Sequence, residues 1–103
     1  MADARRLELH EKLCEILGSR NVYFQPPESI KMKYPCIRYE RSGINTEYAD
    51  NKAYRKLKQY TITVIDRDPD SELIDRVLEL PFSSFSRHYV ADNLNHDVSV
   101  LYY

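Results

Sequence analysis

The chain contains little glycine. Only two of its 103 residues are glycines, so it has no glycine-rich loop that could cradle a phosphate group. With five prolines in addition, neither residue is frequent enough to indicate a low-complexity chain. No uninterrupted apolar run approaches the roughly 18 residues that a membrane-spanning helix needs. These absences argue against P-loop nucleotide chemistry and low-complexity disorder, and we expect no membrane contact.

Cysteine is scarce as well. Cys14 and Cys36 are the only two, and neither a disulfide-dense pattern nor a secretory signal peptide accompanies them. We therefore expect reduced thiols in an intracellular, soluble protein. The formal net charge of −1 argues against a dedicated nucleic-acid binder. A length of 103 residues suits a single domain, residues 1–103, with a modest core.

Tyrosine dominates the aromatic residues. Nine tyrosines stand against three phenylalanines and no tryptophan. A tyrosine combines a large apolar ring with a polar hydroxyl, which suits contacts between subunits. Positions on an ordinary sheet surface explain the tyrosines equally well, so this bias does not by itself indicate an interface.

A strictly alternating stretch, KLKQYTITVID at residues 56–66, predicts the central strand. Tyr60, Ile62 and Val64 would point to one face of a sheet, and Thr63 and Ile65 to the other. The stretch is dense in threonine, isoleucine, valine and tyrosine, which suit a half-buried pleated surface. The following residues change to a helical period.

This second helix is expected directly after the strand. Asp68 can accept the free amide hydrogens of a first helical turn, Pro69 fits the next position, and Pro81 closes the helix. Its apolar stripe consists of Leu73, Ile74, Val77 and Leu78. We therefore expect a central strand that leads into a helix lying across its own sheet.

The remaining elements complete an α-β-β-β-α-β-β order. We expect a first helix over Ala2–Gly18 and strands over Asn21–Gln25, Cys36–Arg41, Phe82–Ala91 and Asp97–Tyr103. This order predicts an α+β domain with a mostly antiparallel sheet and two helices packed on one face.

The segment Ser42–Arg55 joins the second and third predicted strands. It is polar and has little hydrophobic period, so it is either the tip of a long hairpin or a mobile loop. Long connections in small domains are usually functional or disordered, which makes this segment a candidate contact region.

No catalytic site is visible in the sequence. Asp66, Asp68 and Asp70 form the start of a calcium-loop pattern, but Ser71 and Val77 occupy the places of its essential glycine and glutamate. Helix capping explains these acids better. The three histidines have no metal-binding spacing, and neither cysteine has a histidine nearby in the sequence. We expect no enzyme, no cofactor and no metal.

Two alternatives remain open at this point. One is a divalent-metal nuclease in which Asp66 and either Glu40 or Glu47 hold Mg²⁺. The other is a small nucleic-acid-binding domain. Its contacts would come from Arg38, Arg41, Lys52, Arg55 and Lys56.

Charge is segregated along the chain. The run from Lys52 to Lys58 carries four basic residues and no acid, with Tyr54 inside it and Tyr60 just after it. The run from Asp66 to Glu79 carries six acids and two arginines, a net charge of −4. Both runs could be solvated faces, and the basic one could contact a polyanion. If they lie on opposite flanks, head-to-tail contact between copies would pair them and could close a ring.

Two longer runs carry a resemblance to a known family. They are ADNKAYRKLKQYTITVIDRDPDSELIDRVLELP and FSRHYVADNLNHDVSVLYY, with the motifs DNKAYR, VIDRDPDS and DNLNHDV. The chain resembles the tail-terminator or tail-completion proteins of long-tailed bacteriophages, often classed as minor capsid or head–tail joining proteins. The resemblance covers nearly the whole chain. It implies a compact antiparallel sheet flanked by two helices, with a long β-hairpin.

The resemblance also implies a role in virion assembly. Such proteins form a hexameric ring that caps the tail tube, stops polymerisation of the major tail tube protein, and joins a head completion or connector protein. DNA would pass through the ring without sequence-specific binding, and the protein would reside in the host cytoplasm and then at the head–tail junction of the virion. The expected contact residues are Glu47, Tyr48, Asp50, Lys52, Tyr54, Arg55, Lys56, Asp68 and Asp70.

Overall fold

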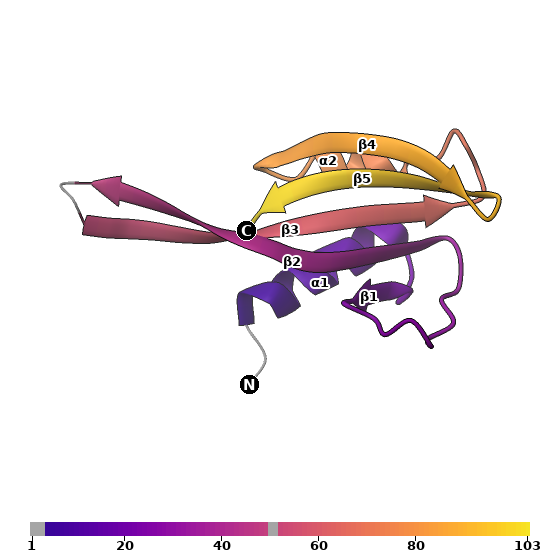
Figure 1. The fold of residues 1–103 in the computed structure, drawn as a ribbon, viewed down its shortest axis with the longest axis horizontal. Coiled ribbons are helices and arrows are strands. Elements are labelled where there is room, and N and C mark those ends of the chain that lie inside the picture. Colours follow the sequence, from indigo (N-terminus) through magenta and orange to yellow (C-terminus); the bar gives the residue numbers. More distant parts are fainter. Residues whose placement is uncertain (1–3, 50–51) are drawn as a thin grey trace.

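One sheet with two helices on the same face forms the domain (Figure 1). The computed structural model describes residues 4–49 and 52–103, and only the backbone of strand residues 45–49 and 52–57. Its elements are α1 (Ala4–Leu17), β1 (Val22–Phe24), β2 (Cys36–Ala49), β3 (Lys52–Asp66), α2 (Leu73–Leu78), β4 (Ser83–Ala91) and β5 (Leu94–Tyr102). The strand order is β1-β2-β3-β5-β4, and only β1 and β2 are parallel. The predicted α+β class and mostly antiparallel sheet are confirmed.

The core lies between the sheet and the helices. Alternate residues of β2, β3 and β5 face α1 and α2, as the period-two pattern of these strands requires. The fully buried side chains there include Leu9, Leu13, Ile37, Tyr39, Ile62, Val64, Val77 and Leu101. Burying one such aliphatic side chain contributes roughly 1.5–3 kcal/mol to the free energy of unfolding, and this layer therefore holds both helices on the sheet.

One end of the second face of the sheet is covered by a connecting segment. Thr63 and Ile65 point away from the helices, as their alternation predicts, and Ile65 is nevertheless only 3% exposed. Pro26 to Met32 cross over this end and line a hollow with Ile65. Cys36, at the same end, is fully buried, and burial raises the pKa of its thiol to about 11. This cover was not predicted.

The start of α2 differs from the prediction. The helix begins at Leu73, and its N-cap is Glu72 rather than Asp68. The Asp66 Oδ1 accepts the Asp68 N–H at 3.1 Å, and the Asp68 Oδ1 accepts the Asp70 N–H at 2.9 Å. An aspartate side chain can accept a hydrogen bond from the amide two residues ahead of it even where no helix follows. These two acids therefore stabilise a turn and do not cap α2. The predicted apolar stripe is confirmed, with Ile74 and Val77 buried.

Three strand boundaries also differ. β2 continues from Cys36 to Ala49 instead of ending at Arg41, β3 begins at Lys52 instead of Lys56, and β5 begins at Leu94 instead of Asp97. Between β4 and β5, Asp92 and Asn93 have φ values of 53° and 61°. Two successive residues with positive φ make the tight turn that matches the twist of a hairpin, so pairing resumes at once.

A polar group is buried under α1. The Tyr39 side chain is fully buried, and its hydroxyl lies 2.7 Å from the Nδ1 of His10 and 3.3 Å from an Arg6 guanidinium nitrogen. The Arg6 guanidinium donates to the hydroxyl, and the hydroxyl and the His10 Nδ1 share a second hydrogen bond. Burial, with smaller contributions from Arg20 and Arg6, lowers the pKa of His10.

This arrangement predicts acid sensitivity. The unfolded chain binds a proton at His10 near the ordinary pKa of 6.5, whereas the folded chain resists it. The free energy of unfolding should therefore fall as the pH drops through 6.5, and His10→Gln should remove that part of the decline. Urea unfolding from pH 7.5 to pH 5 measures both profiles, with the other two histidines unchanged. Parallel profiles for the two proteins would contradict this assignment.

Candidate functional site

A two-stranded ribbon projects from one end of the sheet (Figure 1). β3 pairs with β5 only from Gln59 to Asp66, and β2 pairs with β1 only from Ile37 to Tyr39. The backbone of Ile44–Ala49 and that of Lys52–Lys58 therefore pair only with each other among the described strands. We call these two stretches the hairpin arm. The arm gives the molecule an elongated shape, 50 by 28 by 23 Å.

The hairpin arm carries most of the predicted contact residues. Of the two alternatives for Ser42–Arg55, the structure has the long hairpin. Six of the predicted residues lie on its strands, where only the backbone is described: Glu47, Tyr48, Lys52, Tyr54, Arg55 and Lys56. Asp50 lies outside the described residues.

The other two predicted contact residues lie at the opposite end of the molecule. β3 begins in the arm at Lys52 and ends at Asp66, and the exposed Asp68 and Asp70 follow in the next turn. At about 3.3 Å per residue, fifteen residues span about 50 Å. The predicted residues therefore lie toward the two ends of β3, in an arm that is basic in sequence and in an acidic turn.

The acidic end of the sheet also carries a groove, which we call the end groove. Its volume is about 280 Å³. One wall is the crossing segment from Pro26 to Met32, and the floor comes from the sheet face away from the helices. The floor residues are Arg38, Thr63, Ile65, Tyr89 and His96.

Aromatic stacking organises one side of the end groove. The rings of Tyr89 and His96 are stacked, with centroids 4.5 Å apart and planes 12° from parallel. The Nδ1 of His96 donates to the Leu94 carbonyl oxygen at 3.1 Å, which fixes the ring. The Arg87 guanidinium lies 5.2 Å from the Tyr89 centroid on the same side. The sequence did not predict this groove, because no local pattern links residues from segments so far apart in the chain.

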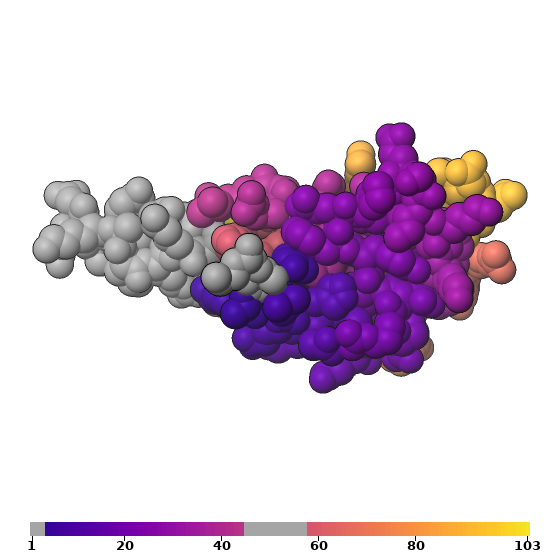
Figure 2. All heavy atoms as spheres, turned by 90° about the horizontal axis from the view of Figure 1, so that it is seen from below, coloured from indigo at the N-terminus to yellow at the C-terminus, as the bar shows by residue number. Residues whose placement is uncertain are grey.

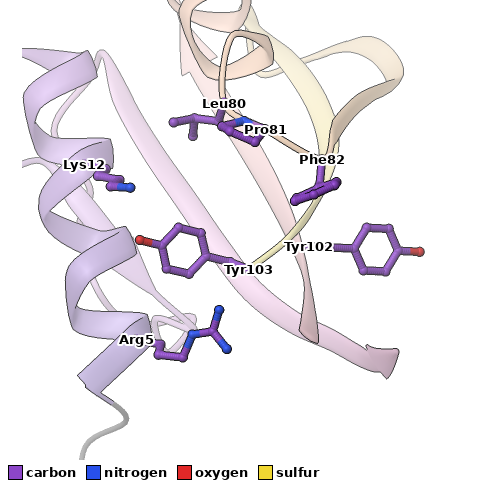
Figure 3. Close-up of a pocket in the computed structure, with 7 residues that line it drawn as sticks. All are labelled: Arg5, Lys12, Leu80, Pro81, Phe82, Tyr102 and Tyr103. Carbon is purple, nitrogen blue, oxygen red and sulfur yellow. The ribbon is translucent and has the colours of Figure 1, made fainter. Parts of the chain in front are cut away.

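A second hollow, of about 260 Å³, lies near the root of the arm (Figure 3). Arg5 and Lys12 of α1 face the Tyr103 ring, and Phe82 forms part of the opposite wall. The Tyr103 hydroxyl donates to Glu8 at 2.7 Å, and the Lys12 Nζ lies 5.1 Å from the ring centroid. These contacts fasten the end of β5 to α1. Figure 2 shows α1 beside the segment around residues 20–40, on the side of the molecule that carries β1.

β4 is an exposed edge strand. All of its residues except the two terminal ones are exposed, and no described strand pairs with its outer side. Phe85 is 51% and Val90 62% exposed. Between Phe85 and Arg87 the strand has a bulge, which together with the arginine charge hinders uncontrolled pairing of edges. Such a surface suits a selective protein contact.

The structure separates the groups needed for the nuclease alternative. Glu40 pairs with Thr61, five residues along β3 from Asp66, which corresponds to roughly 16 Å. Alternation along β3 also puts Thr61 and Asp66 on opposite faces. Within the described part of the chain, no three histidine, cysteine, aspartate or glutamate side chains gather where a metal could bind.

The basic residues and the histidines are likewise divided. Arg38 and Arg41 lie three residues apart on β2 and so point to opposite faces of the sheet. His88 lies opposite Asp97, with Nδ1 2.6 Å from the carboxylate, while His96 lies opposite Tyr89. His88 and His96 therefore face opposite sides and form no pair.

No model of a known protein family matches the chain, and no curated protein matches its sequence. Among the described residues, no helix has both the length and the apolar character needed to cross a lipid bilayer.

The hairpin arm should exchange its amide hydrogens quickly. A two-stranded ribbon without further strands is marginally stable in water, whereas Gln59–Asp66 is paired on both sides. In the isolated protein we expect amides of the arm to exchange roughly 100-fold faster than those of Ile62–Ile65. Hydrogen–deuterium exchange with peptide-level mass spectrometry measures this. Equal protection in both regions would show that the arm is already packed against a partner.

Proposed function

We propose that this chain is a structural protein of virion assembly, which forms a closed ring, caps a phage tail tube and helps join the tail to the head. The observation that supports this best is the separation of charge between the two ends of the molecule. A basic projecting arm and an acidic end lie at opposite ends of a 50 Å axis. The α+β fold with a long hairpin also agrees with what the resemblance to tail-terminator proteins implies.

Opposite ends with opposite charge favour head-to-tail contact. A surface that pairs with a different surface on the next copy produces either a ring or an open filament, depending on the rotation between copies. Complementary charge orients the encounter and speeds association. In a ring, each arm would contact the next copy. A closed ring is also self-limiting, which a cap on a growing tube requires.

The proposed partners follow from this role. One face of the ring would contact the major tail tube protein and the other a head completion or connector protein, while DNA passes through without sequence-specific binding. The exposed apolar side chains on β4 and the hollow near Phe82 provide surface for such contacts. The protein would act in the host cytoplasm and remain at the head–tail junction.

The proposed function can be tested by tube capping. Purified tail tube protein is allowed to polymerise with and without this chain, and tube lengths are measured by electron microscopy. We expect that added protein stops elongation and that it is found at tube ends. Unchanged tube lengths at saturating protein would contradict the proposal.

Charge reversal tests whether the basic arm of one copy contacts the acidic end of the next. Lys56→Glu should weaken ring formation at low salt by about fivefold or more, because it places an acid in the basic run. Asp70→Lys combined with Lys56→Glu should restore part of the loss. Lys12→Glu, on α1, serves as the comparison, and circular dichroism verifies its fold because Lys12 contacts Glu8 and Tyr103. Mass photometry that shows equal effects of Lys56→Glu and Lys12→Glu would argue against pairing of the two ends.

A further inference from the structure

Four side chains are buried on the sheet face that carries no helix. They are Cys36, Thr63, Ile65 and Val98, none of which is more than 8% exposed. They adjoin one another, because Cys36 pairs with Ile65 across β2 and β3, and Thr63 pairs with Val98 across β3 and β5. Both helices lie on the other face of the sheet (Figure 1). The cover of this second-face cluster therefore comes from another part of the chain.

The connection between β1 and β2 lies over the second-face cluster. We call its residues 26–35 the cover segment. Ile30 and Met32 of this segment line the end groove together with Thr63 and Ile65 of the cluster. The segment has no helix or strand of its own. It therefore covers the sheet through side chains and not as a paired element.

Few hydrogen bonds hold the cover segment in place. In the part of the chain that the structure describes, its backbone N–H groups donate twice. Ile30 donates to the Pro27 carbonyl at 3.1 Å, within the segment, and Lys33 donates to the Tyr23 hydroxyl at 3.2 Å. Three of the ten residues are prolines, which have no N–H, and seven of the ten are exposed while none is buried. A segment with these properties opens more easily than a paired strand.

Both ends of the cover segment are fixed to the sheet. The Gln25 N–H donates to the Tyr39 carbonyl at 2.9 Å, and the Gln25 Oε1 accepts the Arg41 N–H at 3.2 Å. Beyond the other end, the Ile37 N–H donates to the Asn21 carbonyl at 3.1 Å. The middle of the segment can therefore lift away while the strands on either side of it keep their positions.

We propose that the cover segment opens as a unit while the sheet stays folded, and that this opening uncovers the second-face cluster. Access to this mostly apolar surface then depends on the position of the cover segment. The motion takes place within one chain, so the inference goes beyond the proposed ring and does not rest on it.

The two native cysteines test the opening. Cys36 belongs to the second-face cluster and is fully buried, whereas Cys14 lies on α1 beneath the other face and is 6% exposed. The isolated chain is treated with N-ethylmaleimide at several low urea concentrations, and mass spectrometry of peptides follows each thiol. We expect Cys36 to react roughly 100-fold faster than Cys14, because its exposure needs only a local opening.

The urea dependence distinguishes local from global opening. A local opening exposes little new surface, so the rate at Cys36 should change little in low urea. Equal rates at the two cysteines, with the same steep dependence on urea, would mean that only global unfolding exposes them. That result would overturn the proposal.

A pair of variants separates the cover segment from the end of β2. Met32→Ser removes a half-buried apolar side chain from the segment, and Ile16→Ser removes one from α1 against the main core. Met32→Ser should speed the reaction of Cys36 about tenfold and leave Cys14 unchanged, whereas Ile16→Ser should speed only Cys14. Circular dichroism verifies that both variants fold.

Two results with these variants would contradict the proposal. If Met32→Ser leaves the fast reaction of Cys36 unchanged, the end of β2 frays on its own and the cover segment does not control access. If Met32→Ser speeds both cysteines by the same factor, the segment stabilises the whole domain and does not open separately.

Discussion

The structure depends on the fact that β3 is paired on both sides over one half and on one side over the other. Over Gln59–Asp66 the strand is paired on both sides and buries Tyr60, Ile62 and Val64 beneath the helices. Over Lys52–Lys58 it pairs only with β2. One continuous strand is therefore both the centre of the domain and half of a projecting arm.

The same strand connects the two surfaces that the proposed function needs. Its last residues form part of the end groove and lead into the acidic turn at Asp68, and its first residues form the arm. The separation of the two surfaces thus depends on the length of one continuous strand. A fixed angle between successive copies is what distinguishes a ring of defined size from an irregular chain.

Much of the fold follows from the sequence, because period-two and helical patterns are local. The alternation of β3 and the stripe of α2 were predicted, as was the order of elements. The predicted start of α2 was wrong. Asp68 accepts an amide hydrogen within a turn, and an aspartate side chain can do so equally in a turn or at a helix cap. The end groove could not be predicted, because Pro26–Met32 and Tyr89 meet only through the order of strands in the sheet. The contact role of the arm remains a prediction from charge and resemblance.

The central claim is that copies of this chain close into a ring by joining opposite ends. Class averages from electron microscopy of the purified protein, alone and mixed with tail tubes, test it most directly. We expect closed rings of one size with a central opening, seated on tube ends, in which neighbouring subunits overlap at their tips. Monomers that ignore the tubes, or filaments of unlimited length, would contradict it.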